Sequence, residues 1–407
     1  MTIQGSRTGR RSMLKAAGLA TLGGMPGCAA PERVAAVPSS STAAATVLGI
    51  PNERFVFAGE PGSAAAAIER EFAAAATRQA RRLGLRSTAQ LPQYNLLGVS
   101  GGGENGAFGA GLLCGWSAQG TRPAFDLVTG VSTGALTAPF AYLGSDWDPQ
   151  LKGVYTDIGP DDVLRSRGLL AAVFQDALAD SEPLLRTISR YLDARMLAAL
   201  ARAYGDGRLL FVGSTNLDAQ VPVVWNIGAI AASGHPKALD LVRRLLLASA
   251  AIPGAFPPVM IDVTIDGEAR QEMHVDGGAF AQVFLYPHRV GEARRARARR
   301  GERVVPANAY VIRNGRLDPD WASVDRRTLT IAGRAISTMI AASGYNDVIR
   351  IWNAAERDGI DYNLAFISRD FTGSYTRPFE QAYMRALYDY AFERARQGYP
   401  WAKRPPI

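Results

Sequence analysis

The chain has 407 residues, of which 47% are apolar and 20% are charged. That balance excludes a bundle of membrane helices and supplies enough apolar material for one large globular domain or two modest ones. The net charge of +8 comes almost wholly from arginine and is not accompanied by zinc-finger spacing, a Walker loop or aromatic-basic interleaving, so no nucleic-acid partner is expected. Three histidines and two cysteines exclude a dense metal site and a disulfide framework, and no cofactor is expected.

Residues 1–28 have the form of an export signal. Arg10 and Arg11 precede an apolar stretch, residues 16–25, that is too short to span a bilayer. The arginine pair and its neighbours resemble a twin-arginine signal, and the run that ends at Cys28 resembles a lipobox. The second resemblance implies that Cys28 is lipidated, with ordinary cleavage nearby as the alternative. We therefore expect an exported protein of the cell envelope or periplasm, anchored through Cys28.

The remainder divides by composition into four parts. Residues 29–60 are rich in Ala, Ser and Pro and are expected to form a tether. Residues 61–93 favour a helical N-terminal extension. Residues 94–290 alternate short apolar strands, turns and helices, which predicts a mostly parallel sheet with helices on both faces. Residues 291–407 are expected to add strands and helices that complete the domain, and residues 161–203 to form a helical cap over the site.

Each expected element follows from apolar periodicity and the turn residues that bound it. The expected strands lie at 95–100, 125–129, 208–214, 221–226, 273–275, 304–313 and 363–368. The longer helices are expected at 61–86, 106–116, from the turn near 132 to 142, and at 238–250, 327–350 and 379–397.

The turn Gly130-Val131-Ser132-Thr133-Gly134 joins the strand at 125–129 to the next helix. A nucleophilic serine must project from a sharp strand-to-helix turn, and small residues two positions before and after it relieve the crowding. Gly130 and Gly134 meet that need, and the helix N-terminus directs amide dipoles toward developing negative charge. The pattern predicts a catalytic Ser132, with a mere tight turn as the alternative.

Gly101, Gly102 and Gly103 follow the first strand of this region, and Gly106 opens the next helix. A triple glycine at such a place lets backbone N–H groups converge on an anion. Acyl transfer needs these donors for its oxyanion, and each contributes roughly 3 to 4 kcal/mol. The Gly-Lys-Ser/Thr close of a phosphate loop is absent, and the glycine spacing does not fit a dinucleotide loop. We therefore predict an oxyanion hole at Gly101 to Gly103.

The third motif is Asp276-Gly277-Gly278, after the strand at 273–275. An aspartate followed by two glycines can bring its carboxylate close to another loop, but a common turn has the same sequence. Taken by itself, the motif leaves both interpretations open.

Together and in this order, the three motifs resemble the patatin-like phospholipase family. Residues 248–258 are also similar to the Ser-Ala-x-x-Pro-x-x-Phe-Pro stretch of that family. The resemblance spans roughly residues 94–287 and implies a three-layer α/β/α patatin-like fold, here with helices added at both ends. It also implies a Ser-Asp dyad, with Ser132 as nucleophile, Asp276 as its base and the amides around Gly102 and Gly103 as the oxyanion hole.

One residue departs from the family pattern. The family has Arg or Lys after the glycines, and this chain has Asn105. A positive charge that helps to hold an anionic oxygen is absent, and an amide donor stands in its place.

His274 is a rival for the base, because it should share a strand face with Asp276, two residues on. An ordinary triad places a histidine between serine and aspartate, and His288 follows soon after. The alternative for either histidine is a structural hydrogen bond. In a dyad Asp276 must take the serine proton directly, so burial is expected to raise its pKa above the usual value of about 4.

These motifs predict a serine acyl-hydrolase of the phospholipase A or lipid acyl hydrolase type, acting at a membrane surface through an acyl-enzyme. Two alternatives are an esterase or thioesterase on soluble esters and a non-catalytic lipid-binding envelope protein on the same fold. The basic run at residues 294–300 is expected either to lie against anionic headgroups or to be a solvated face. The sequence leaves the oligomeric state open.

Overall fold

A computed structural model of the chain describes residues 33–166, 177, 179–319 and 321–406. The export signal and lipidated Cys28 predicted for residues 1–28 lie outside the described residues.

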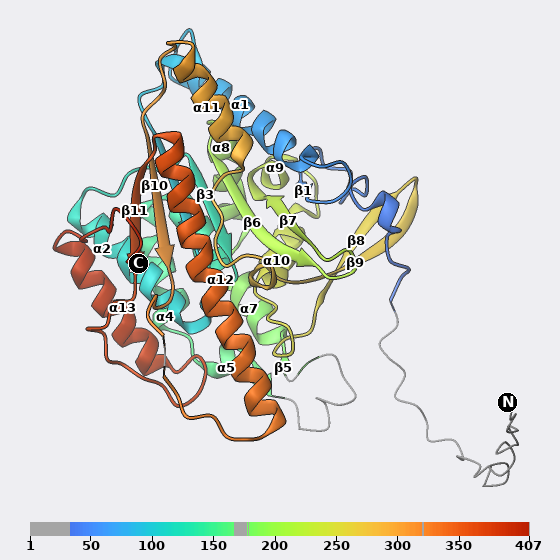
Figure 1. Ribbon diagram of the computed structural model, residues 1–407. Helices are drawn as coiled ribbons and strands as arrows, with labels where there is room; N and C mark the ends of the chain where they lie inside the picture. Colours follow the sequence, from blue (N-terminus) through green and yellow to red (C-terminus); the bar gives the residue numbers. More distant parts are fainter. Residues whose placement is uncertain (1–32, 167–176, 178, 320, 407) are drawn as a thin grey trace, which may run out of the picture. The chain divides into compact units, whose positions relative to one another are not determined.

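A nine-stranded sheet forms the centre of the fold (Figure 1). Its strands are β1 (Arg54–Val56), β2 (Tyr94–Val99), β3 (Leu127–Val131), β6 (Leu209–Asn216), β7 (Val221–Asn226), β8 (Val259–Ile265), β9 (Glu268–Asp276), β10 (Ala307–Arg313) and β11 (Asp361–Phe366). The main path runs β1-β7-β6-β3-β2-β10-β11, and β9 pairs with both β6 and β8. The strands from β6 to β11 on this path are mutually parallel, whereas β7 and β9 are antiparallel to β6.

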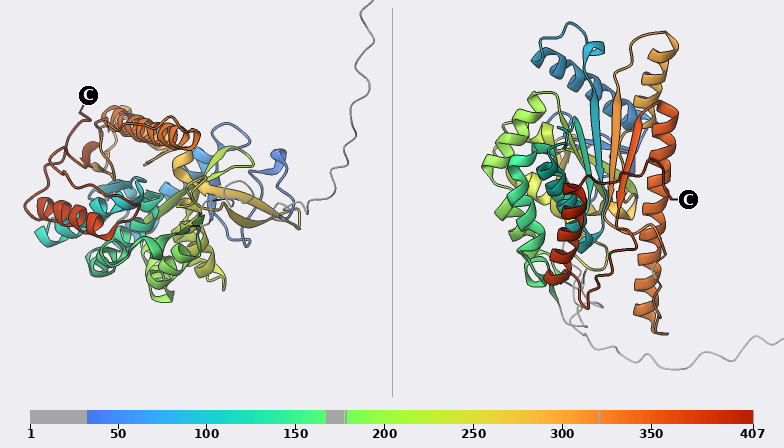
Figure 2. Two further views of the ribbon diagram at one scale, coloured as in Figure 1. Left: turned by 90° about the horizontal axis from the view of Figure 1, so that it is seen from below. Right: turned by 90° about the vertical axis from the view of Figure 1, so that its left-hand side faces the viewer.

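Helices cover both faces of the sheet, which confirms the three-layer α/β/α architecture (Figure 2). One face carries α1 (Ser63–Arg82), α11 (His288–Arg299) and α12 (Thr328–Asp358). The other carries α2 (Gly106–Gln119), α3 (Thr133–Leu143), α4 (Asp148–Thr156), α5 (Pro160–Val163), α7 (Glu182–Tyr191), α8 (Ala194–Gly205), α9 (Ile227–Ala232), α10 (Ala238–Ser249) and α13 (Gln381–Arg396). A short ribbon of β4 (Arg165–Ser166) and β5 (Ala179–Asp180) stands apart from the sheet.

Small residues on α2 let α13 approach closely. A Cβ added to Gly111 would lie 2.2 Å from the carbonyl oxygen of Tyr388, and one added to Gly115 would lie 2.2 Å from that of Phe392. Only glycine tolerates such backbone proximity. The C-terminal helix is thereby locked onto the helix that follows the glycine-rich loop.

The tether predicted for residues 29–60 is wrong for the described part of that segment. Val37, Val47 and Ile50 are buried. Residues 33–56 run along the β8–β9 hairpin, where Ala36 and Thr46 form bridges, and then enter the sheet as β1. The composition indicated a solvated chain because the segment is rich in Ala, Ser and Pro. The hairpin supplies the partner that a composition argument does not include.

Candidate active site

Two strands end head to head along β6. β3 pairs with β6 as far as Val131 and Gly213, and β9 takes over at the next residue of β6, where Ser214 pairs with Asp276. Because β9 runs antiparallel to β6, its last residue meets the end of β3. Ser132, directly after β3, and Asp276, the last residue of β9, are therefore brought together.

Ser132 has the backbone of a nucleophile elbow. Its φ is 55° and its ψ is −128°, an uncommon conformation for a residue with a side chain, and α3 starts at the next residue. The two flanking glycines are required by contact. A Cβ on Gly130 would lie 2.4 Å from the carbonyl oxygen of Gly134, and a Cβ on Gly134 would lie 2.2 Å from that of Val99. The turn is wedged against the end of β2 and projects Ser132 from it.

Ser249 links the elbow to β6 through two hydrogen bonds. The Ser132 amide donates to the Ser249 hydroxyl at 3.0 Å, and that hydroxyl donates to the carbonyl oxygen of Gly213 at 2.6 Å. Ser249 is fully buried at the end of α10. Ser249 belongs to the stretch at 248–258 that resembles the family, but its role at the elbow was not predicted. Its place in that stretch was the sequence signal for such a role.

Asp276 is a buried carboxylate without a cationic partner. The Ser132 side chain forms a hydrogen bond to it, and the Gly278 amide donates to its Oδ1 at 2.7 Å. Among the described residues no Lys, Arg or His forms an ion pair with it. Burial outweighs both hydrogen bonds and raises the pKa of Asp276 to about 6.

The two glycines after Asp276 permit close packing. A Cβ on Gly277 would lie 2.5 Å from the carbonyl oxygen of Gly213, and a Cβ on Gly278 would lie 2.4 Å from Nε2 of Gln282. Gly277 therefore lets the end of β9 press against β6, and Gly278 leaves room for the side chain that holds the turn.

Only two of the three amides predicted to form the oxyanion hole are without a hydrogen-bond partner among the described residues. The Gly101 amide already donates to the Gln282 carbonyl at 3.0 Å, so the prediction that Gly101 belongs to the oxyanion hole is wrong. Gly101 has a packing role instead, since its Cβ would lie 3.2 Å from that of Ser132. The amides of Gly102 and Gly103 have no hydrogen-bond partner among the described residues, and Gly103 lines the same pocket as Ser132.

Asn314, directly after β10, holds this loop in place. Its side chain accepts from the Gly109 amide at 3.0 Å and donates to the Ser100 carbonyl at 2.9 Å. Gly102 passes so close that a Cβ there would lie 2.1 Å from the Asn314 carbonyl oxygen. Gly106 is equally constrained, with its Cβ position 2.1 Å from Oγ1 of Thr133. Sequence reasoning missed Asn314, which lies far from the glycines in the chain.

Asn105, which replaces the basic residue of the family pattern, contacts α13. The Tyr383 hydroxyl donates to Oδ1 of Asn105 at 2.6 Å. The side chain is half-buried and its carbonyl oxygen is occupied. The contact ties the oxyanion loop to the C-terminal helix.

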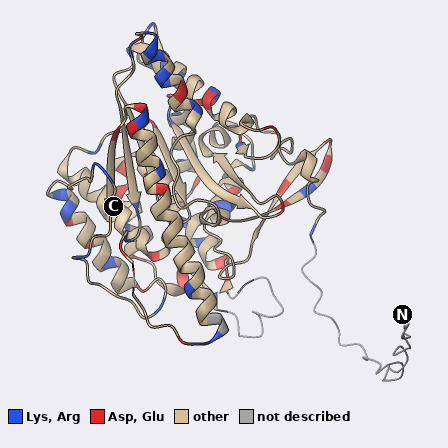
Figure 3. Cartoon of the chain, in the orientation of Figure 1, with Lys and Arg blue, Asp and Glu red and all other residues tan. Residues whose placement is uncertain are grey.

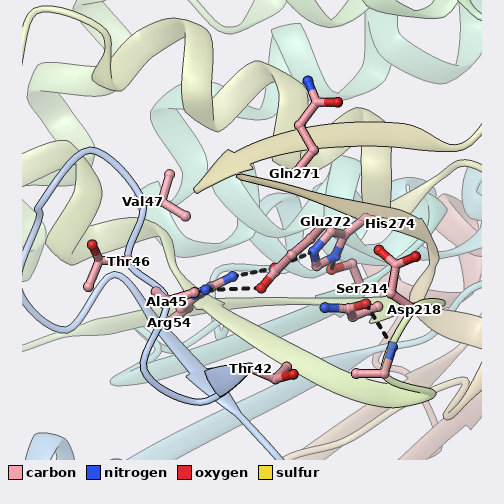
Figure 4. A network of polar contacts seen from close by, with 12 residues as sticks. Thr42, Ala45, Thr46, Val47, Arg54, Ser214, Asp218, Gln271, Glu272 and His274 are labelled. Atoms are coloured by element: carbon pink, nitrogen blue, oxygen red, sulfur yellow. Dashed lines mark hydrogen bonds and ion pairs between the residues drawn. The ribbon is translucent and has the colours of Figure 1, made fainter. Parts of the chain in front are cut away.

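His274 is committed to a structural network and is not placed to serve as the base (Figure 4). Its Nδ1 lies 2.9 Å from the Ser214 hydroxyl, and its Nε2 lies 3.0 Å from a carboxylate oxygen of Glu272. Glu272 also forms an ion pair with Arg54 of β1, at 2.6 Å. Both ring nitrogens are used, and burial lowers the pKa of His274. The structural alternative therefore holds for this residue. His288 starts α11 and lines a separate surface hollow with residues of α1 and α12.

An apolar pocket opens at Ser132. Its walls come from α3, α4, α5, α7, α8, α10 and α13, with aliphatic and aromatic side chains that include Leu136, Phe140, Ile158, Leu184, Ile188, Met196, Phe256 and Met384. The polar side chains in the lining include those of Ser132, Thr133, Thr187 and Glu104. Within the described ranges, no group of three or more His, Cys, Asp or Glu side chains could hold a metal ion. The site therefore joins a serine–carboxylate pair to a lining suited to a hydrocarbon chain.

Comparison with known proteins identifies the class of this domain. Residues 97–287 match the family described as patatin-like phospholipase. This match confirms the family resemblance of the motifs and supports a lipid acyl hydrolase in general terms.

Solved structures include one similar chain, VipD from Legionella pneumophila, at 12% sequence identity and a TM-score of 0.36. The alignment covers 75% of this chain and 66% of VipD, so the chain spans just under two thirds of that protein. No curated protein matches.

Proposed function

We propose that this protein is a serine hydrolase that cleaves lipid esters, with Ser132 as nucleophile and Asp276 as its general base. One observation carries the proposal. A serine held at positive φ forms a hydrogen bond with a buried carboxylate, whose pKa is about 6, at the mouth of an apolar pocket. At neutral pH that carboxylate is ionised yet more basic than an ordinary aspartate, which suits proton transfer.

The reaction proceeds in two steps. Asp276 takes the proton from the Ser132 hydroxyl as its oxygen attacks the ester carbonyl carbon, and the amides of Gly102 and Gly103 donate to the resulting oxyanion. The leaving alcohol receives the proton from Asp276, and an acyl-enzyme on Ser132 remains. Asp276 then takes a proton from the water that attacks the acyl-enzyme, and it returns that proton to the Ser132 oxygen as the fatty acid is released.

The pocket supports a lipid rather than a small soluble ester. Side chains from seven helices line one largely apolar pocket, which also includes Ser132. A site with this lining favours a long acyl chain over an acetyl group, because each buried CH2 contributes about 0.8 kcal/mol.

We also propose that the enzyme works in the cell envelope, exported and anchored through Cys28. The support for this part is the form of residues 1–28 alone. The expected substrate surface is therefore a membrane.

The test is labelling by a fluorophosphonate probe, combined with product analysis. The wild-type chain should react, and Ser132→Ala should not. Ser145→Ala, at an exposed serine after α3, is the matched control and should label like wild type. Mass spectrometry of products from phospholipid micelles and from a short-chain monomeric ester separates the alternatives. Preference for the monomeric ester would favour a soluble esterase, and the absence of any labelling would favour a non-catalytic lipid-binding protein.

A further inference from the structure

Helix α12 has two halves with opposite surface character. From Gly344 onward it packs on the sheet through Val348, Ile351 and Ala355. The outward positions of this half are polar and exposed, as at Asn346 and Asn353. This is the pattern expected of a helix that covers one face of a sheet.

The N-terminal half reverses that pattern. Ile331, Ala335, Met339 and Ala342 follow one another at helical spacing, and the same stripe continues into Asn346 and Asn353. Ile331 is 51% exposed and Met339 is 63% exposed. The outward face is therefore apolar in the first half of the helix and polar in the second. A long apolar stripe of this kind on the outside of a helix needs a partner.

The apolar half projects beyond the edge of the sheet that holds the active site (Figure 2). Gly344 lies against the guanidinium of Arg313, the last residue of β10, and Asp347 accepts from the Gln282 amide at 2.7 Å. Residues 328–343 precede that level. At 1.5 Å per residue they extend about 24 Å past the strand ends. Ser132 and Asp276 lie at the same ends.

Other exposed apolar side chains lie on the same edge. Trp321, in the segment that leads into α12, is 87% exposed. Phe280, four residues after Asp276, is 58% exposed. Tryptophan is enriched where protein meets the headgroup region of a bilayer. Arg326 and Arg327, both exposed, stand directly before the helix and suit anionic headgroups.

The basic run of α11 does not compete for this role. Arg294 donates to the carbonyl oxygens of Asp358 and Gly359, and Arg295 pairs with Asp358. Part of the run therefore serves to hold α11 on α12. It leads into the start of β10, at the opposite edge of the sheet from Ser132 (Figure 3).

We propose that Trp321, Ile331 and Met339, the α12 docking face, bind the surface of an anionic lipid bilayer and bring the Ser132 edge to it. The choice of a bilayer rests on the proposed lipid substrate. In the described part of the chain, no helix has both the length and the apolar composition to cross a membrane. In the proposed complex the apolar side chains of the docking face lie among the upper acyl groups and its arginines among the phosphates.

Vesicle binding tests the proposal in the full chain with Cys28→Ser, which removes any lipid anchor. Vesicles of phosphatidylcholine with phosphatidylglycerol should bind this protein, and the double variant Ile331→Gln and Met339→Gln should bind at least about tenfold more weakly. Glutamine keeps helix propensity. Leu83→Gln, at an exposed leucine after α1, is the matched control and should change binding less than about twofold. Equal binding by all three proteins would overturn the proposal.

A fluorescent label gives a second readout that does not depend on removing apolar side chains. An environment-sensitive dye at Met339→Cys should brighten and shift to the blue on anionic vesicles, and the same dye at Asn353→Cys should not, although both positions share one stripe. If the wild type is a dimer, the glutamine variant is a monomer and both bind vesicles equally, the face binds a second copy of the chain. That result would overturn the proposal that it binds a bilayer.

Turnover of a monomeric ester separates this proposal from the proposed function. It should be equal in the wild type and the glutamine variant, because no residue of the α12 docking face lines the pocket. If neither protein cleaves any ester while vesicle binding still depends on Ile331 and Met339, the docking face stands and the hydrolase does not.

Discussion

Asp276 and Glu272 are two buried carboxylates on one face of β9, four residues apart, and their surroundings differ in one respect. Glu272 is 1% exposed and Asp276 is 4% exposed, so burial acts on both in the same direction. At Glu272, burial alone would raise the pKa, but the hydrogen bond with His274 and the charge of Arg54 hold it below the usual value. Asp276 has a hydroxyl and an amide as partners and no cation, and its pKa rises to about 6.

The difference separates a structural carboxylate from a reactive one. Arg54 comes from the N-terminal segment that lies on the β8–β9 hairpin. Its guanidinium forms an ion pair with Glu272, and the same carboxylate also contacts Nε2 of His274 (Figure 4). The Glu272 network fastens that segment and holds the strand whose last residue is Asp276. Asp276 itself keeps the basicity that a cation would remove. Five predictions test this contrast.

The largest effect is expected from Asp276→Asn. Turnover should fall by about 10²- to 10⁴-fold, since the amide can still accept hydrogen bonds but cannot take the serine proton. Steady-state hydrolysis measures the loss, with Asp262→Asn, an exposed carboxylate on β8, as control. Activity close to wild type would refute the dyad.

The same variant should be more stable than wild type at pH 8. The folded pKa of about 6 lies above the ordinary 3.8, so ionised Asp276 destabilises the fold at high pH. Its removal should raise the free energy of unfolding by on the order of 2 to 3 kcal/mol at pH 8, and by little at pH 4, where the folded group is protonated and the unfolded group is only partly ionised. Urea denaturation at the two pH values makes the comparison.

Glu272→Gln should act mainly on stability. It removes the closer of the two buried carboxylates beside Arg54 and leaves Glu53 at 3.8 Å, a change that should cost up to about 3 to 5 kcal/mol. Glu268→Gln, at an exposed glutamate on the same strand, should cost less than about 0.5 kcal/mol. Thermal unfolding of both variants gives the answer. Similar melting temperatures for the two would mean that the buried network contributes little.

The pH profile reports Asp276 directly. The base must be ionised, so kcat/KM should rise about tenfold per pH unit below a pKa of about 6 and level off above it. Stopped assays with a monomeric ester between pH 4 and pH 8 would record this profile. Urea denaturation at each pH would show that the protein is folded over that range. A rate that stays flat down to about pH 4 would assign the base to a group with an ordinary carboxylate pKa.

The smallest effect on turnover is expected from His274→Gln. The glutamine can replace part of the bonding to Ser214 and Glu272, so kcat should stay within about tenfold, with a stability loss of about 1 to 3 kcal/mol. Hydrolysis and urea denaturation of one preparation measure both. A loss of turnover as large as that of Asp276→Asn would make the histidine part of the catalytic machinery.

Local motifs were the part of the site that could be predicted. The elbow at Ser132 and the turn after Asp276 can both be recognised in the sequence from their glycines, which relieve close contacts at each turn. Supporting residues could not be found in this way. Ser249 and Asn314 hold the elbow and the glycine-rich loop through hydrogen bonds that span more than 100 residues, and nothing near either residue in the chain indicates its partner.

Errors in the prediction have the same origin. Gly101 has the sequence context of an oxyanion donor, but the Gln282 carbonyl, brought by another segment, occupies its amide. Residues 33–60 have the composition of a tether, but the edge of the β8–β9 hairpin offers them backbone partners. A hydrogen-bonding group or an apolar side chain is satisfied by whatever the fold places beside it, and composition does not contain that information.

By itself, the sequence determined the alternation of strands and helices, the family of the domain and the turns that carry Ser132 and Asp276. The tertiary structure decided which glycine amides of the loop have a hydrogen-bond partner, which buried carboxylate lacks a cation and which half of α12 lies beyond the sheet. The physical reason is range. Turn geometry is set by sterics between neighbouring residues, whereas the pairing of Ser132 with Asp276 depends on β6, where one strand ends and another begins.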